Sequence, residues 1–235
     1  MGAKDYLLKW LGQGLLIGLY ACVVAIGLLE AYDKEATAVF AMPVARRVIV
    51  LDAGHGAWDP GMVANDVMES PINLAIAAQL QRYLELGGAT VLMTRVDDEV
   101  LADTKREDMR ARQVLADGAQ ADILVSIHQN SYPQASVRGA QAFYHGRSAE
   151  GKRLAESIQT ELVTYLDPDN RRMAKEDESY FLLKETTLPS IIVECGFLSN
   201  DEERRLLSRA EYQERVAWAV YMGIVQYFAG ENAAY

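Results

Sequence analysis

The longest apolar run of the sequence lies near the amino terminus. Residues 10–29 contain a single strongly polar side chain, Gln13. A helix rises ~1.5 Å per residue, so a run of this length matches the hydrocarbon thickness of a bilayer. Lys4 and Lys9 precede the run and acidic residues follow it, which favours export of the rest of the chain. We expect residues 1–30 to be an uncleaved signal anchor, with a cleaved signal peptide as the alternative, and residues 31–45 to be a linker.

Beyond residue 45, apolar positions alternate between two periods. Short apolar runs rich in β-branched residues predict strands at residues 47–52, 89–94, 123–127, 140–144 and 190–194. Helical spacing predicts helices from Ser70-Pro71 to Gly87 and at residues 105–116, 150–165, 201–207 and 211–228, with Ser70 as the first N-cap. This alternation indicates a three-layer α/β fold, in which helices flank a mixed, largely parallel sheet. We assign residues 46–230 to one domain of this kind.

Charge and cysteine content exclude some classes of function. The chain has 23 Lys and Arg residues against 33 Asp and Glu residues, for a formal net charge of −10. Since no basic stretch is present to neutralise phosphates, we expect no nucleic-acid partner. The two cysteines, Cys22 and Cys195, cannot build a disulfide framework. Strand periodicity places Cys195 on the face opposite Glu194, where we expect a core residue.

Three residues with metal or acid–base chemistry stand at the ends of predicted strands. His55 follows the strand at residues 47–52 through a glycine loop, His128 follows residues 123–127, and Glu194 ends residues 190–194. The carboxyl ends of parallel strands share one edge of a sheet, where ligands bind. We therefore expect these side chains to converge. Imidazoles and carboxylates at an open edge suit a catalytic zinc ion.

Strand ends alone do not identify a third protein ligand. Four carboxylates close to the first loop are candidates: Asp52, Asp59, Asp66 and Glu69. Glu69 immediately precedes the predicted helix start, which would hold it rigidly. On these grounds alone, the choice among the four stays open.

Four motifs together resemble one enzyme family. They are VIVLDAGHGAWDPG at residues 48–61, Glu69 ahead of NLAIA at 73–77, ADILVSIHQN at 121–130 and IIVECGFLSN at 191–200. In this order they resemble the zinc-dependent N-acetylmuramoyl-L-alanine amidases of bacterial cell-wall metabolism. The resemblance covers about residues 46–229, which makes 46–230 the expected catalytic domain.

The resemblance implies a role for each of four residues. It implies that His55, Glu69 and His128 bind one Zn²⁺ ion, and that Glu194 is the catalytic carboxylate. The loop departs from the family pattern at Ala57, where a second glycine is usual, and alanine tolerates a positive φ poorly.

Other polar residues near the motifs have candidate supporting roles. We expect Asp52 and Ser126 to orient the ligand histidines, with bonding to the backbone as the alternative. Asn130 and Arg95 are candidates for substrate contacts, and a solvated ion pair is the alternative for Arg95.

The short chain is also similar to one subgroup, the single-domain, membrane-anchored, germination-specific amidases of endospore formers. That similarity implies cleavage between N-acetylmuramic acid and L-Ala in spore cortex, the first step toward muramic-δ-lactam. It also implies an extracytoplasmic location, in the space between the two forespore membranes. We expect peptidoglycan as substrate, the membrane as a partner through residues 10–29, and an accessory sporulation protein. The alternatives are a zinc peptidase acting on the stem peptide and a non-catalytic peptidoglycan-binding or complex-forming protein.

Overall fold

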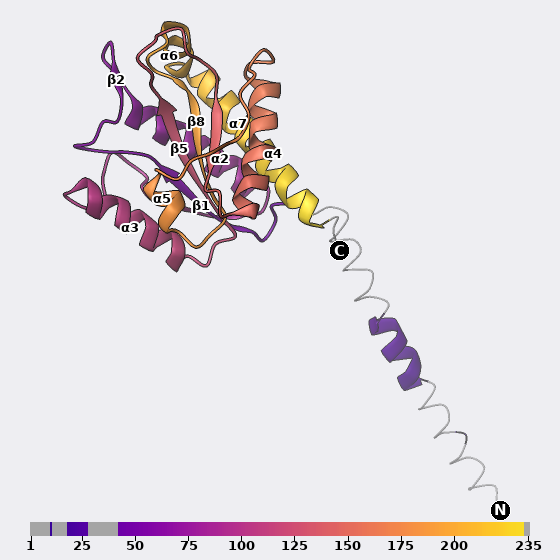
Figure 1. The fold of residues 1–235 in the computed structure, drawn as a ribbon. Helices are drawn as coiled ribbons and strands as arrows, with labels where there is room; N and C mark the ends of the chain where they lie inside the picture. Colours follow the sequence, from indigo (N-terminus) through magenta and orange to yellow (C-terminus); the bar gives the residue numbers. More distant parts are fainter. Residues whose placement is uncertain (1–9, 11–17, 28–41, 233–235) are drawn as a thin grey trace, which may run out of the picture. The chain divides into compact units, whose positions relative to one another are not determined.

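The computed structural model describes Trp10 and residues 18–27 and 42–232 (Figure 1). The chain divides into two compact units, Met1–Ala41 and Met42–Tyr235. In the first unit residues 18–27 are helical, while the rest of the predicted anchor except Trp10, and residues 31–41 of the predicted linker, lie outside the described residues. Within the described part of the chain, no helix is long and apolar enough to cross a bilayer. The anchor therefore stays a prediction.

A six-stranded sheet forms the centre of the second unit, in the order β4-β1-β5-β8-β6-β7. The four strands β4, β1, β5 and β8 are parallel, β6 runs antiparallel to β8, and β7 pairs parallel to β6. This arrangement confirms the predicted mixed, largely parallel sheet. In sheet order the strands span Thr90–Met93, Val48–Ala53, Ile123–Asn130, Ser190–Phe197, Gln141–Tyr144 and Lys175–Glu176.

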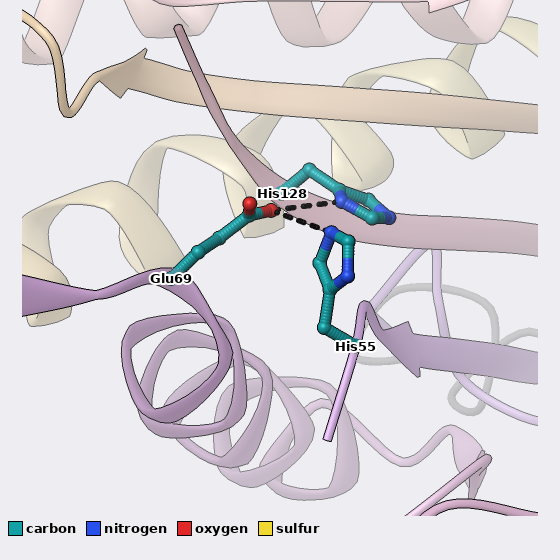
Figure 2. A group of neighbouring side chains, drawn as sticks. All are labelled: His55, Glu69 and His128. Atoms are coloured by element: carbon teal, nitrogen blue, oxygen red, sulfur yellow. Dashed lines mark hydrogen bonds and ion pairs between the residues drawn. The ribbon is translucent and has the colours of Figure 1, made fainter. Parts of the chain in front are cut away.

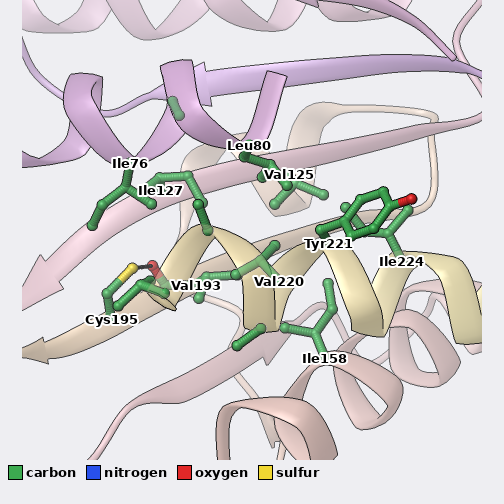
Figure 3. Packing of buried hydrophobic residues seen from close by; sticks show 14 of the residues in the cluster. Ile76, Leu80, Val125, Ile127, Ile158, Val193, Cys195, Val220, Tyr221 and Ile224 are labelled. Carbon is green, nitrogen blue, oxygen red and sulfur yellow. Dashed lines mark hydrogen bonds between the residues drawn. The ribbon is translucent and has the colours of Figure 1, made fainter. Parts of the chain in front are cut away.

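Helices cover both faces of the sheet (Figure 1). The larger core packs one face against α2 (Glu69–Leu86), α4 (Ala149–Tyr165) and α7 (Ala210–Asn232), as Figure 3 shows. A smaller cluster on the other face includes residues of α3 (Lys105–Gly118) and α5 (Phe181–Glu185). The short helix α6 (Asp201–Leu207) precedes α7.

Alternation along the strands assigns each side chain to one of these layers. Ile49 and Leu51 enter the larger core while Val50 enters the smaller cluster, because successive strand residues point to opposite faces. Cys195 is buried in the larger core, as predicted, and both cysteines are free.

The start of α2 differs from the prediction. The helix begins at Glu69, its N-cap is Met68, and no side chain caps it. Ser70 is therefore a helical residue, and its hydroxyl accepts a hydrogen bond from Arg95 Nη2 at 3.3 Å. The prediction of Ser70 as N-cap was wrong because carbonyls of the preceding loop satisfy the first helical amides: those of Glu69 and Ser70 donate to Met62 at 2.9 Å and Pro60 at 3.0 Å.

Three short features of the structure do not follow from the hydrophobic periodicity of the sequence. A hairpin joins β2 (Val63–Ala64) to β3 (Val67–Met68), and its two turn residues have φ of 47° and 63°. The strand β7 and the helix α5 are also short. Segments of two to five residues show no period that a sequence pattern can reveal.

Candidate active site

Residues at the carboxyl ends of three neighbouring parallel strands meet at one edge of the sheet. His55 lies in the loop after β1, His128 lies near the end of β5, and Glu194 belongs to β8. His128 and Glu194 are direct partners in the β5–β8 register. The structure therefore brings together the side chains that the strand-end argument expected to converge.

His55, Glu69 and His128 form a compact group of potential metal ligands (Figure 2). Glu69 Oε1 lies 2.9 Å from His128 Nδ1 and 3.3 Å from His55 Nε2. One donor atom from each residue lies within 4.8 Å of the others. Two imidazole nitrogens and one carboxylate oxygen are a donor set that suits zinc and leaves a coordination position open.

Several contacts fix the carboxylate of Glu69, a residue that is only 3% exposed. Oε1 also accepts hydrogen bonds from Asn73 Nδ2 at 3.1 Å and from the Gln129 backbone amide at 3.0 Å. Oε2 accepts a hydrogen bond from the Met62 amide at 2.8 Å. These donors hold the carboxylate toward the histidines before any metal binds.

The ionisation of the group fits a cationic occupant. Burial alone would raise the pKa of Glu69, but hydrogen bonds from His128 and His55 outweigh it and hold that pKa well below its usual range. Burial opposes a charge on His128, yet its contact with Glu69 raises the pKa of His128 to about 9. The carboxylate thus stays anionic and favours positive charge beside it.

Two glycines make room for the ligand side chains. A Cβ on Gly54 would lie 2.2 Å from His128 Cε1. A Cβ on Gly61, whose φ is +68°, would lie 2.5 Å from Glu69 Oε2 and 2.8 Å from His55 Cδ2. The loop therefore needs glycine at both positions to approach the ligand group this closely.

The other three candidate carboxylates lie in different surroundings. Asp59 Oδ2 is 2.9 Å from His55 Nδ1, the ring nitrogen that faces away from Glu69. Asp66 is exposed in the turn of the β2–β3 hairpin. Asp52 is buried and accepts hydrogen bonds from Ser126 Oγ at 2.5 Å and from Thr94 Oγ1 at 2.7 Å.

Asp59 is the carboxylate that orients His55, a role that the sequence argument gave to Asp52 and Ser126. Among the hydrogen bonds of the described residues, Asp52 and Ser126 bond to each other and not to a histidine ring. A carboxylate on the second imidazole nitrogen fixes the ring and its tautomer. The signal in the sequence was the i, i+4 spacing of His55 and Asp59. In the structure, an isolated antiparallel β-bridge between Gly56 and Asp59 turns the loop back on itself.

Arg95 is buried beneath the loop that follows β1 and bonds to its backbone. Its side chain is 2% exposed, and Nε donates to the Ala53 carbonyl at 2.8 Å. Nη2 donates to the carbonyls of Gly54 at 3.1 Å and Ser70 at 2.9 Å. A guanidinium bound in this way holds the loop backbone together and is not a solvated ion pair. Arg95 is also not among the residues that line the cavity beside the ligand group.

Glu194 faces the cavity beside the ligand group. The cavity has a volume of about 410 Å³, and Asn130, Ser126 and Tyr180 also line it. The Tyr180 hydroxyl donates to Glu194 Oε1 at 3.1 Å, while Oε2 is buried without a hydrogen-bond partner. Burial raises the pKa of Glu194 to about 7. The carboxyl can therefore exchange a proton near neutral pH.

The site's geometry agrees with a comparison against known families. Residues 49–226 match the model of a family described as N-acetylmuramoyl-L-alanine amidase. The chain belongs to this amidase family. The resemblance drawn from the four motifs is thereby confirmed, and the match spans the strands and loops that carry all three members of the ligand group as well as Glu194.

Two amidases of Bacillus subtilis (strain 168) illustrate the similarity. The germination-specific N-acetylmuramoyl-L-alanine amidase is 35% identical over 229 residues, which cover 94% of this chain and 95% of that protein. The N-acetylmuramoyl-L-alanine amidase LytC is 30% identical over 205 residues, which cover 86% of this chain and 40% of LytC. The amidase domain is thus shared with relatives of different length.

Solved amidase structures share the fold. The CwlD amidase from Clostridioides difficile, in complex with the GerS lipoprotein, superposes with a TM-score of 0.76 at 39% identity and covers 79% of this chain and 100% of that chain. An N-acetylmuramoyl-L-alanine amidase from Clostridium difficile 630 gives a TM-score of 0.73 at 28% identity, covering 79% and 98%.

Proposed function

We propose that this amidase hydrolyses the amide bond between N-acetylmuramic acid and L-Ala of peptidoglycan with a single zinc ion held by His55, Glu69 and His128. The observation that supports this most directly is the ligand group itself. Two imidazoles and an ionised carboxylate meet within 4.8 Å beside Glu194, and together they line one cavity. A zinc ion bound there would polarise the scissile carbonyl and lower the pKa of a water molecule.

The protein's own residues supply the proton transfers. Glu194 takes the proton of the attacking water on Oε2, the oxygen without a partner, and later delivers it to the leaving amine of L-Ala. The Tyr180 hydroxyl holds Oε1, so Oε2 is the carboxylate oxygen that keeps a free lone pair for the proton. Asp59 keeps the His55 ring oriented, and Asn130, which lines the cavity, contacts the substrate.

We further propose that the enzyme acts on spore cortex as the first step toward muramic-δ-lactam. Similarity to a germination-specific amidase over 94% of the chain supports this role. The CwlD structure contains a lipoprotein, GerS, and we propose an accessory lipoprotein here as well. Residues 10–29 would anchor the enzyme to a membrane, with the catalytic domain outside the cytoplasm between the two forespore membranes.

Product analysis tests the reaction. The full chain, purified in detergent, is incubated with denuded peptidoglycan, and the products are identified by mass spectrometry. We expect free peptides with an L-Ala amino terminus, lost with a chelator and restored by Zn²⁺. Released reducing sugars, or peptides cut within the stem while muramoyl–L-Ala bonds remain intact, would contradict the proposed reaction. The second outcome would favour a zinc peptidase.

Cortex analysis tests the biological role separately. In a strain that lacks the gene, we expect spore cortex without muramic-δ-lactam, and we expect the wild-type gene to restore it. Cortex with a normal muramic-δ-lactam content would overturn the sporulation role and leave the amidase reaction untouched.

The binding-protein alternative is tested with the purified chain. Binding of zinc and peptidoglycan without turnover, even with the accessory protein added, would point to a binding protein.

A further inference from the structure

A second buried arginine lies beneath the loop that follows β1 and carries His55. The proposed reaction assigns it no role. Arg112 of α3 is 1% exposed. Its Nε donates to Asp108 Oδ2 at 2.7 Å, and Nη1 donates to Asp52 Oδ1 at 2.8 Å and to the Ala53 carbonyl at 2.9 Å. Nη2 donates to the carbonyl of His55 at 2.8 Å. One guanidinium therefore joins the end of β1 to the backbone of a ligand residue.

The backbone of that ligand residue is strained. His55 has a φ of +64°, which is uncommon for any residue other than glycine. Such a conformation persists only when surrounding contacts fix it. The Arg112 hydrogen bond acts on the His55 peptide itself, while Asp59 acts on its ring. The position of Nε2 relative to Glu69 depends on both contacts.

Arg95 and Arg112 together bond the backbone carbonyls of the loop that follows β1. Arg95 holds the carbonyls of Ala53 and Gly54, and Arg112 holds those of Ala53 and His55. Three successive carbonyl groups thus point at two guanidinium groups. The planar fork of an arginine can reach several acceptors at fixed angles, which a lysine ammonium cannot do. Asp52 and Asp108 offset the cost of burying the charge of Arg112.

We infer that Arg112 is a positioning residue for the metal centre, which holds the His55 backbone in its left-handed conformation and so sets the affinity of the site for zinc. The inference rests on the proposed zinc site. It assigns to Arg112 an effect on metal binding that is separate from its part in folding. Contacts behind a metal ligand typically change affinity 10–100-fold.

The test compares Arg112→Lys with Asp108→Asn in the full chain. The first variant keeps the positive charge at residue 112 and removes the fork. The second removes the negative charge beside Nε, while the hydrogen bonds from Arg112 to the carbonyls of Ala53 and His55 stay in place. Zinc Kd is measured by competition with a chromophoric chelator, and the visible absorption of the Co²⁺-substituted protein reports ligand geometry. We expect Arg112→Lys to weaken zinc binding by about 10–100-fold and to alter the Co²⁺ spectrum. Asp108→Asn should lower Tm while zinc Kd stays near the wild-type value.

A double variant keeps the test available if Arg112→Lys does not fold. Arg112→Gln/Asp108→Asn removes one charge of each sign, so the buried cluster keeps its balance. We expect weakened zinc binding in the double variant as well. Wild-type zinc Kd and Co²⁺ spectrum in whichever Arg112 variant folds would overturn the inference, as would equal weakening by Asp108→Asn alone. Failure of the wild-type chain to bind zinc would instead overturn the proposed function.

Discussion

The two sides of the catalytic cavity are built differently. On the metal side, the Glu69 carboxylate is contacted by both histidines, by the Asn73 amide and by two backbone amides. On the acid side, Glu194 accepts one hydrogen bond, from Tyr180, and its other oxygen is buried without a partner. Dense bonding suits a group that must keep its position and charge. An oxygen without a partner suits a group that must take up a proton and release it.

Removal of the acid side should have the largest effect on turnover. Glu194→Gln keeps the size of the side chain but removes the carboxylate that accepts the proton. We expect kcat to fall by about 10²–10⁴-fold, the usual contribution of a general acid–base group. Metal analysis of the same preparation should still find one zinc ion per chain, because the ligand group is intact. Full activity in the glutamine variant would exclude Glu194 as the proton carrier.

A change on the metal side should alter the affinity of the site for zinc. Gly54→Ala places a methyl group 2.2 Å from His128 Cε1, so the imidazole must move. We expect zinc Kd to rise by at least about tenfold, since ligand orientation controls metal affinity. Gly118→Ala is the matched control, because a Cβ there meets nothing within 4 Å. Equal zinc Kd in the two variants would show that the His128 ring tolerates displacement.

A smaller change on the acid side removes only the hydroxyl of Tyr180. Tyr180→Phe keeps the ring packed beside Phe143 and frees both oxygens of Glu194. We expect kcat to fall by about tenfold, corresponding to one hydrogen bond to a charged group, with zinc Kd unchanged. Tyr165→Phe, at the exposed end of α4, is the control and should have no effect. A rise in KM without loss of kcat would make Tyr180 a substrate contact instead.

The same contrast explains what the sequence could and could not reveal. Strand ends predict that His55, His128 and Glu194 converge, because the topology of a parallel sheet requires it. The selection of Glu69 among the four candidate carboxylates came from the family resemblance. The position of Glu69 at the start of α2 did not by itself distinguish it from Asp59 in the loop.

The side chains that support the ligands and the acid from a distance were the hardest to predict. Arg112 and Arg95 belong to a helix and a loop far along the chain from the carbonyls they bind. Tyr180 precedes α5, which is too short to show a period. Hydrogen bonds to backbone depend on the local path of the chain, which residue types and spacing do not encode.

The smallest effect should come from the loop position where the sequence departs from the family pattern. Ala57 has a φ of +43°, a left-handed conformation that costs a non-glycine residue about 1 kcal/mol. Ala57→Gly should therefore raise the free energy of unfolding by up to about 1 kcal/mol, measured by urea denaturation. Ala78→Gly, on an exposed position inside α2, is the opposite case and should lower it by about 1 kcal/mol.

Measuring the zinc Kd of Ala57→Gly and Ala78→Gly connects loop stability to the metal side of the cavity. If the hydrogen bonds from Arg95 and Arg112 already fix the loop, relief of strain at Ala57 should leave zinc Kd unchanged while stability rises. Weaker zinc binding in Ala57→Gly would mean that the stiffness of alanine also helps to hold His55. The arginines would then share control of the ligand with the residue two positions beyond it in the chain.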